Sequence, residues 1–245
     1  MHWREHSIIL SSKSFSENSR IITVFNKKMG KISGLVTGLK QSLQSGDISD
    51  VTWNGRTAEQ LGRFKMEIIF SPFVHIINNP IGIFIIENAC FLCLKGLPEK
   101  APHPNLYDAL KTLLLSMPKE KDFLINYVFF EIQFLAEVGV GLSLSRCAVT
   151  GKTEGLFYVS PKTGCAITKE AGEKHKDKLF VLPPFLVSND TPTDNDIFSA
   201  LKITEHFLKI YFYGINIERL PLSRNYLMTK LIERIHGTKN QCNTQ

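Results

Sequence analysis

The sequence lacks any apolar run long enough to cross a membrane. No stretch approaches the roughly 20 apolar residues that a membrane-spanning helix needs. The first ten residues have no basic segment leading into an apolar core, as a secretory signal would have. Cysteine is also scarce, because the 245 residues contain only five, an odd number, and these are widely scattered. We therefore expect a reduced, cytoplasmic protein without a membrane segment or a disulfide framework.

Local catalytic motifs are absent as well. The sequence has no G-x-S-x-G, no H-E-x-x-H and no close pair of acidic residues in a defined setting. Gly151-Lys152-Thr153 is similar to the end of a phosphate-binding loop, but that loop needs a glycine where Arg146 stands. Cys90 and Cys93 lie inside an apolar helix pattern, where cysteine acts as a small hydrophobe. We expect no enzyme, although a site assembled from distant residues stays open as an alternative.

The segment from 145 to 173 has the spacing of a zinc ribbon without its ligands. A ribbon needs two C-x-x-C pairs about fifteen to twenty residues apart. Cys147 and Thr150 have the spacing of the first pair, and Thr168 and Ala171 have that of the second. One thiolate cannot build a closed tetrahedral site, so the sequence predicts no metal and no cofactor.

Short β patterns fill the first 70 residues. In LGRFKMEIIF, from Leu61 to Phe70, apolar Phe64 alternates with basic Arg63 and Lys65, which places the two kinds of residue on opposite faces. Five such short strands suit a closed barrel, because closure removes the sheet edges. The expected strands cover residues 8–11, 20–25, 32–36, 47–53 and 61–70.

From Pro80 onward the pattern becomes helical. An aromatic stripe that includes Phe123, Tyr127 and Phe134 marks the third helix as the centre of this half. We expect Asp122 to cap that helix and Asp194 to cap a later one. The expected helices cover residues 80–96, 104–117, 123–138, 196–213 and 226–235, and 239–245 looks frayed. The predicted fold is therefore α+β, with a barrel domain at 1–78 and a helical domain at 79–245, the ribbon-like insert lying within the latter.

A mildly basic composition permits a nucleic-acid partner without requiring one. The net charge is +6 and the pI is about 9.0. Basic residues gather in the β half, around the turn after residue 25 and on one face of the last strand, so they could follow a phosphate backbone. A solvated surface is the alternative, and Trp3 and Trp53 could stack on bases or be buried. The predicted DNA-binding residues are Arg20, Lys27, Lys28, Lys31, Lys40, Arg56, Arg63 and Lys65.

Several segments, in this order, resemble the bacterial recombination mediator family RecO. They are SIILSS, ENSRIITVF, GKISGLVTGLK and the Gly-Asp-x-x-x-x-x-Trp stretch from Gly46 to Trp53, followed by AEVGVGLSLSRCAVTG and YVSPKTG. A late segment, from Arg219 to Arg224, is similar to a family motif that ends in Ser-Arg. The resemblance covers nearly the whole chain. Only Cys147 matches a zinc-ligand position, so the chain resembles those members that lack the metal.

The resemblance implies an N-terminal OB-fold, a helical domain and a zinc-ribbon-like insert. It also implies a protein that binds single- and double-stranded DNA and anneals complementary strands. Such proteins act with RecR to help RecA displace single-strand binding protein, whose acidic, apolar C-terminal tail is a further expected partner. The expected location is the cytoplasm, in association with the nucleoid. Two alternatives remain open: an RNA-binding OB-fold factor of translation or ribosome assembly, and an enzyme that presents a nucleic acid to a site in the helical half.

Overall fold

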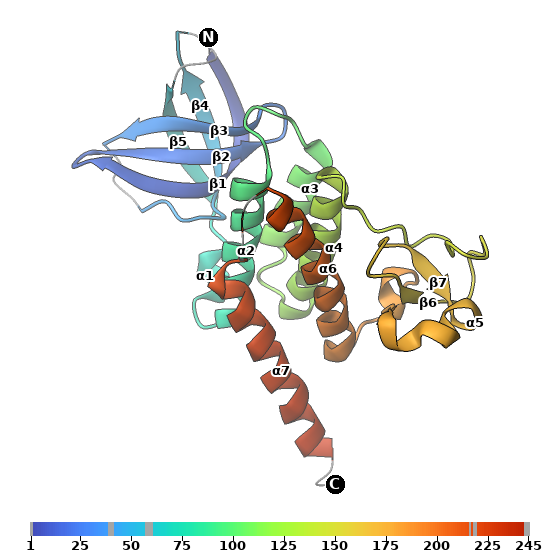
Figure 1. The fold of residues 1–245 in the computed structure, drawn as a ribbon. Helices are drawn as coiled ribbons and strands as arrows, with labels where there is room; N and C mark the ends of the chain where they lie inside the picture. The colour runs from blue at the N-terminus through green and yellow to red at the C-terminus, as the bar shows by residue number, and fades with distance from the viewer. Residues whose placement is uncertain (1, 39–41, 57–60, 216, 218–219, 243–245) are drawn as a thin grey trace. The chain divides into compact units, whose positions relative to one another are not determined.

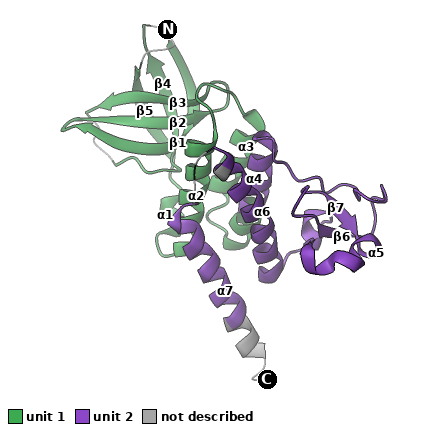
Figure 2. Ribbon diagram, viewed as in Figure 1, with its two compact units in different colours: residues 1–126 green, residues 127–245 purple. Residues whose placement is uncertain are grey.

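A computed structural model describes residues 2–38, 42–56, 61–215, 217 and 220–242 (Figure 1). The chain divides into two compact units, residues 1–126 and residues 127–245 (Figure 2). This division falls within helix α4 (Glu120–Glu137). The domain boundary expected near residue 78 stays a prediction.

The first unit contains a closed five-stranded barrel. Its strands are β1 (His2–Ser16), β2 (Ser19–Asn26), β3 (Gly30–Thr37), β4 (Ile48–Asn54) and β5 (Gly62–Phe70). The strands follow one another around the barrel in the order β1-β2-β3-β5-β4. All neighbours are antiparallel except β3 and β5, which are parallel. The predicted barrel with OB-fold character is confirmed.

Apolar side chains and two tryptophans fill the barrel. The alternation predicted for β5 is observed, because Phe64 is buried while Arg63 and Lys65 are exposed. Trp53 is 4% exposed, and Trp3 stacks on it with ring centroids 6.2 Å apart. Neither indole is therefore a freely exposed platform for a base. Gly62 is needed beside this pair, since a Cβ there would lie 2.0 Å from the indole nitrogen of Trp53.

Strand β1 is much longer than the predicted 8–11. Its first half pairs with β4, from His2 to Ile8, and its second half pairs with β2, from Ser7 to Ser16. The N-terminal residues were expected to precede the strand because they are polar. Cross-strand hydrogen bonds to β4 and the inward-facing Trp3 hold them in it, so tertiary pairing outweighs local composition.

The helical part of the first unit contains α1 (Phe73–Ile76), α2 (Pro80–Gly96), α3 (Pro104–Leu115) and the start of α4. Asn79 caps α2, because its side-chain oxygen accepts hydrogen bonds from the N–H groups of Ile81 and Gly82. Burial raises the pKa of Cys90 to about 12, in keeping with a thiol that packs as a hydrophobe. Helix α4 begins at Glu120, so the expectation that Asp122 is its cap is wrong.

In the second unit, the remainder of α4 joins α6 (Asp194–Gly214) and α7 (Leu222–Cys242). Thr193, and not Asp194, caps α6. The Thr193 hydroxyl accepts from the Asp196 N–H at 3.2 Å, and the Asp196 carboxylate accepts from the Thr193 N–H at 2.9 Å. The insert carries β6 (Leu156–Val159), β7 (Ala166–Thr168), α5 (Lys169–Gly172), η1 (Glu173–Lys178), β8 (Phe180–Val181) and η2 (Pro184–Leu186). Its three strands form a sheet in the order β7-β6-β8.

A buried ion pair lies in the core of the second unit. Arg224 is 2% exposed and pairs with Glu131, which is fully buried. Arg224 also donates to the hydroxyl of Tyr127 at 2.9 Å and to the carbonyl of Leu201 at 2.8 Å, and Thr204 donates to Glu131. These bonds compensate for the loss of hydration that burying both charges costs. Arg224 therefore joins α7 to α4 and α6.

No helix in the described ranges is long and apolar enough to span a membrane.

Candidate nucleic-acid interface

Three neighbouring strands of the barrel align their outward residues in rows. Pairing of β1 with β4, and of β4 with β5, fixes which residues are opposite one another. Within a row, neighbouring strands lie about 4.8 Å apart, and successive rows are separated by about 6.8 Å. From the end nearest Arg56, the rows are His2–Asn54–Arg63, then Arg4–Thr52–Lys65, then His6–Asp50–Glu67.

The first two rows and Arg56, which follows β4, form a surface that we call the strand face. Its ionised side chains are Arg4, Arg56, Arg63 and Lys65, all exposed. Neither of its two rows contains a carboxylate, whereas the third row contains Asp50 and Glu67. The rows therefore differ in charge, with basic residues toward one end of the strands and acidic residues toward the other, and the ion pair of Arg4 with Asp50 lies at the border between them.

Arg4 is the strand-face residue that the sequence prediction missed. Its Nε donates to Asp50 Oδ2 at 2.7 Å, and its side chain stays 68% exposed. The hydrogen bond and the charge of Asp50 raise the pKa of Arg4, and the same hydrogen bond lowers the pKa of Asp50. The alternation of His2, Arg4 and His6 with Trp3 was the available signal, because period two places these three residues on one face.

Three of the predicted DNA-binding lysines, Lys27, Lys28 and Lys31, lie in or next to the turn between β2 and β3, and each has a partner. Lys27 Nζ lies 2.6 Å from the carboxylate of Asp108, and Lys28 forms an ion pair with Glu5. Both pairs are at the surface, where such contacts contribute little to stability. They still place a negative charge beside each ammonium group and so weaken the turn as an anion site.

Lys31 lies in the interior of the first unit. It is 9% exposed, and its Nζ donates to the backbone carbonyls of Leu94 at 2.7 Å and Leu97 at 2.5 Å. Burial lowers the pKa of Lys31. Because these carbonyls belong to the C-terminal end of α2, the ammonium group satisfies acceptors that the helix leaves free. This placement gives Lys31 a structural role, and we do not include it in the interface.

The other predicted residues are dispersed. Arg20 is half-buried and donates to the hydroxyl of Ser12 at 2.7 Å and to the Ser12 carbonyl at 3.1 Å. Lys40 falls outside the described residues. Of the eight predicted DNA-binding residues, the structure brings Arg56, Arg63 and Lys65 together on the strand face.

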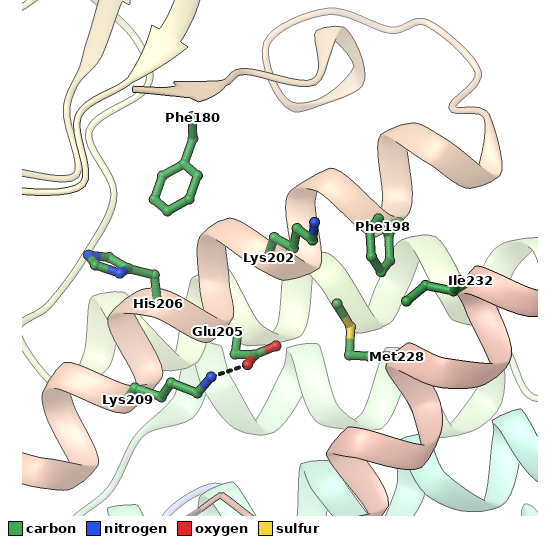
Figure 3. Close-up of a pocket in the computed structure, with 8 residues that line it drawn as sticks. All are labelled: Phe180, Phe198, Lys202, Glu205, His206, Lys209, Met228 and Ile232. Carbon is green, nitrogen blue, oxygen red and sulfur yellow. Dashed lines mark hydrogen bonds and ion pairs between the residues drawn. The ribbon is translucent and has the colours of Figure 1, made fainter. Parts of the chain in front are cut away.

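The second unit contains a separate groove of about 360 Å³ (Figure 3). Apolar Phe180, Phe198, Met228 and Ile232 line it, and basic Lys202 and Lys209 stand beside them on α6. Its remaining lining residues are Glu205, which pairs with Lys209, and His206. Lys202 Nζ lies 4.6 Å from the ring centroid of Phe198. The groove thus combines an apolar floor with a basic margin.

Comparison with known proteins identifies the family. Residues 1–72 match the family model described as Recombination protein O N terminal, and residues 80–217 match Recombination protein O C terminal. The chain belongs to the RecO family. A DNA repair protein RecO from Bartonella tribocorum is 35% identical over 244 residues, covering 97% of this chain and 98% of the relative. Two proteins of the same name are also similar. The one from Rhizobium rhizogenes is 37% identical and covers 89% of this chain and 87% of the relative. The one from Rhodospirillum centenum is 32% identical and covers 96% of this chain and 94% of the relative.

In this RecO chain the ribbon-like segment has Cys147 at one of the four zinc-ligand positions, and non-ligand residues occupy the other three. The thiol is buried, and its Sγ accepts hydrogen bonds from the N–H groups of Thr150 at 3.4 Å and Thr168 at 3.3 Å. Burial by itself raises the pKa of this thiol, but hydrogen bonds from the Thr150 side chain and from backbone N–H groups lower it to about 6. Thr150, Thr168 and Ala171 do not suit zinc, and the described residues contain no cluster of three or more histidine, cysteine or acidic side chains able to hold a metal.

The late RecO motif has a structural explanation. Its Ser223 and Arg224 open helix α7, and both side chains are buried. Arg224 forms the ion pair with Glu131 described above, so the motif supplies the charged contact between α7 and the rest of the second unit. We assign Arg224 to the core and not to a ligand site.

Proposed function

We propose that this RecO chain is a DNA-binding recombination mediator in DNA repair. The observation that carries the proposal is the strand face, where Arg56, Arg63 and Lys65 are exposed and the rows of Arg63 and Lys65 contain no carboxylate. Basic side chains held on a rigid sheet can follow the phosphates of a nucleic acid and release its counterions. Family membership supports DNA as the nucleic acid in preference to RNA.

The proposed activity needs positioning and charge neutralisation, and no bond is made or broken. Binding single- or double-stranded DNA through its phosphates is insensitive to base sequence. Neutralising those phosphates lowers the repulsion between two complementary strands, so annealing follows from binding. We further propose that the chain acts with RecR to help RecA load onto DNA covered by single-strand binding protein, in the cytoplasm and in association with the nucleoid.

The test is fluorescence anisotropy of a labelled single-stranded oligonucleotide, titrated with salt. The three phosphate contacts from Arg56, Arg63 and Lys65 contribute about −2.1 to the slope of log K against log salt, since each contact contributes about 0.7. Addition of the complementary strand should then give annealing faster than the uncatalysed rate. No binding at low salt would exclude the proposal. Preference for an RNA oligomer of the same sequence would favour the translation or ribosome-assembly alternative.

We also propose a site for the C-terminal tail of single-strand binding protein. The groove on α6 and α7 has an apolar floor for the tail's apolar side chains, and Lys202 and Lys209 for its acidic ones. Lys202 forms no ion pair with any residue that the structure describes, so its charge is available. A small cavity with an apolar floor and one or two cations suits a short acidic peptide better than a folded surface.

A fluorescent peptide with the tail's acidic and apolar composition tests this site. Lys202→Gln should weaken its binding several-fold, and Lys230→Gln, which removes a lysine of α7 that pairs with Glu233 outside the groove, serves as the matched control. Equal affinities for both variants, or no binding of the peptide at high micromolar concentration, would remove the groove from the proposal.

A further inference from the structure

We propose that Arg4 is a fourth phosphate ligand of the strand face and that the row containing Asp50 and Glu67 ends the DNA path. This inference rests on the proposed function, because it assumes that the strand face binds DNA. It adds a residue on a different strand and gives the path a direction along the barrel. The juxtaposition that supports it is the row in which Arg4 and Lys65 flank Thr52.

The geometry makes Arg4 suitable for an anion even though it contacts Asp50. A guanidinium group has five N–H donors, and contacts from Nε and one Nη leave three for a phosphate. The side chain is 68% exposed, so those donors reach solvent. Asp50 is only 17% exposed and holds one edge of the guanidinium against the sheet. Arg4 therefore loses less conformational freedom on binding than an unrestrained arginine would.

The third row explains where the path stops. Glu67 is exposed and lies opposite Asp50 on the neighbouring strand. Two carboxylates in one row repel phosphate, and the single positive charge of Arg4 on the adjacent row is too small to offset both of them. His6 is the third member of that row. A strand that follows Arg56, Arg63, Lys65 and Arg4 must therefore turn away from the barrel before it reaches Glu67.

The experiment measures single-strand binding of the full chain against salt, with Arg4→Gln and Glu67→Gln. Losing one phosphate contact costs about eightfold in affinity at 50 mM salt and about fourfold at 150 mM, and makes the slope about 0.7 less steep. We expect this loss of affinity and this shallower slope for Arg4→Gln. Glu67→Gln should instead tighten binding about twofold at low salt, as expected for removal of one unit charge about 8 Å from a phosphate in water.

Three further variants separate charge from structure. Arg4→Lys keeps the charge but not the paired contact with Asp50, so it should retain the slope of the unmodified chain. Lys121→Gln, which removes an exposed lysine of α4 that belongs to none of the barrel strands, should leave affinity unchanged. Arg63→Gln should weaken binding by the same factor as Arg4→Gln, and a thermal melt of each variant confirms that the barrel is folded.

The outcomes discriminate between the two proposals. If Arg63→Gln weakens binding while Arg4→Gln and Glu67→Gln leave affinity and slope unchanged, the strand face binds DNA but Arg4 and the acidic row play no part. Equal loss of slope in Arg4→Gln and Arg4→Lys would also overturn the inference, because a phosphate ligand is defined by its charge. No binding by the unmodified chain would overturn both.

Discussion

Two clusters of basic side chains on the barrel differ in how freely their charge can meet an anion. The turn cluster consists of Lys27, Lys28 and Lys31, and each ammonium group already contacts a carboxylate or a carbonyl. On the strand face, Arg63 and Lys65 make no ion pair with any described residue. The turn has more lysines within a few residues, yet the strand face offers more available charge. Density of positive charge along a sequence is therefore a poor guide to an anion site until its counter-charges are known.

The sharpest test of this comparison neutralises two residues in each cluster. The double variant Arg63→Gln, Lys65→Gln should lose about 60-fold in single-strand affinity at 50 mM salt, because two phosphate contacts disappear. The matched variant Lys27→Gln, Lys28→Gln removes the same charge and should lose less than about threefold, because both lysines lie outside the strand face and each already pairs with a carboxylate. Anisotropy titrations measure both. A larger loss in the turn variant would reverse the assignment.

Substitution of Lys31 is expected to have the next largest effect, and the quantity that changes is the stability of the folded protein. Lys31→Met should lower the free energy of unfolding by about 2 kcal/mol, since the carbonyls of Leu94 and Leu97 lose a charged donor. Urea denaturation followed by fluorescence measures this, with Lys13→Met, an exposed position on β1, as the control. Unchanged stability together with weakened DNA binding would return Lys31 to the interface.

The smallest expected effect is a gain. Asp108→Asn frees the ammonium group of Lys27 and should raise DNA affinity about twofold at low salt, as the loss of one nearby unit charge implies. Asp122→Asn, an exposed acid of α4, is the control for net charge. The difference between the two variants should vanish at about 0.5 M salt, where charges more than a few ångström apart are screened. A gain that persists at that salt would point to a conformational cause.

Prediction from sequence succeeded where a local pattern determines the outcome. Alternation in β5 placed Phe64 inside and Arg63 outside, and the aromatic stripe of α4, with Tyr127 and Phe134, is buried as expected. Prediction failed where a partner lies far away in the chain. Lys31 looks like a surface lysine until the carbonyl of Leu94, 63 residues later, is brought beside it.

The same reasoning explains the other misses. Nothing in the neighbourhood of Glu131 shows that it will be buried, because its compensating charge is Arg224, which lies 93 residues away. Arg4 was missed because the polar residues before Ile8 were interpreted as preceding a short strand. The alternation of His2, Arg4 and His6 with Trp3 was nevertheless present in the sequence. The groove of the second unit could not be located from the sequence, because its lining residues come from α6, α7 and β8. No local sequence pattern predicts how these three elements are placed relative to one another.

The length of β1 has a consequence for synthesis on the ribosome. His2 pairs with Asn54, 52 residues later, so at about 5–20 residues per second its partner strand appears roughly 3–10 s after it. During that interval the first half of β1 is an unpaired edge, which can recruit other chains. The charged side chains of Arg4 and Glu5 oppose such association in the nascent chain. Arg4, which we assign to the DNA path in the finished barrel, would thus also oppose aggregation while the barrel is being made.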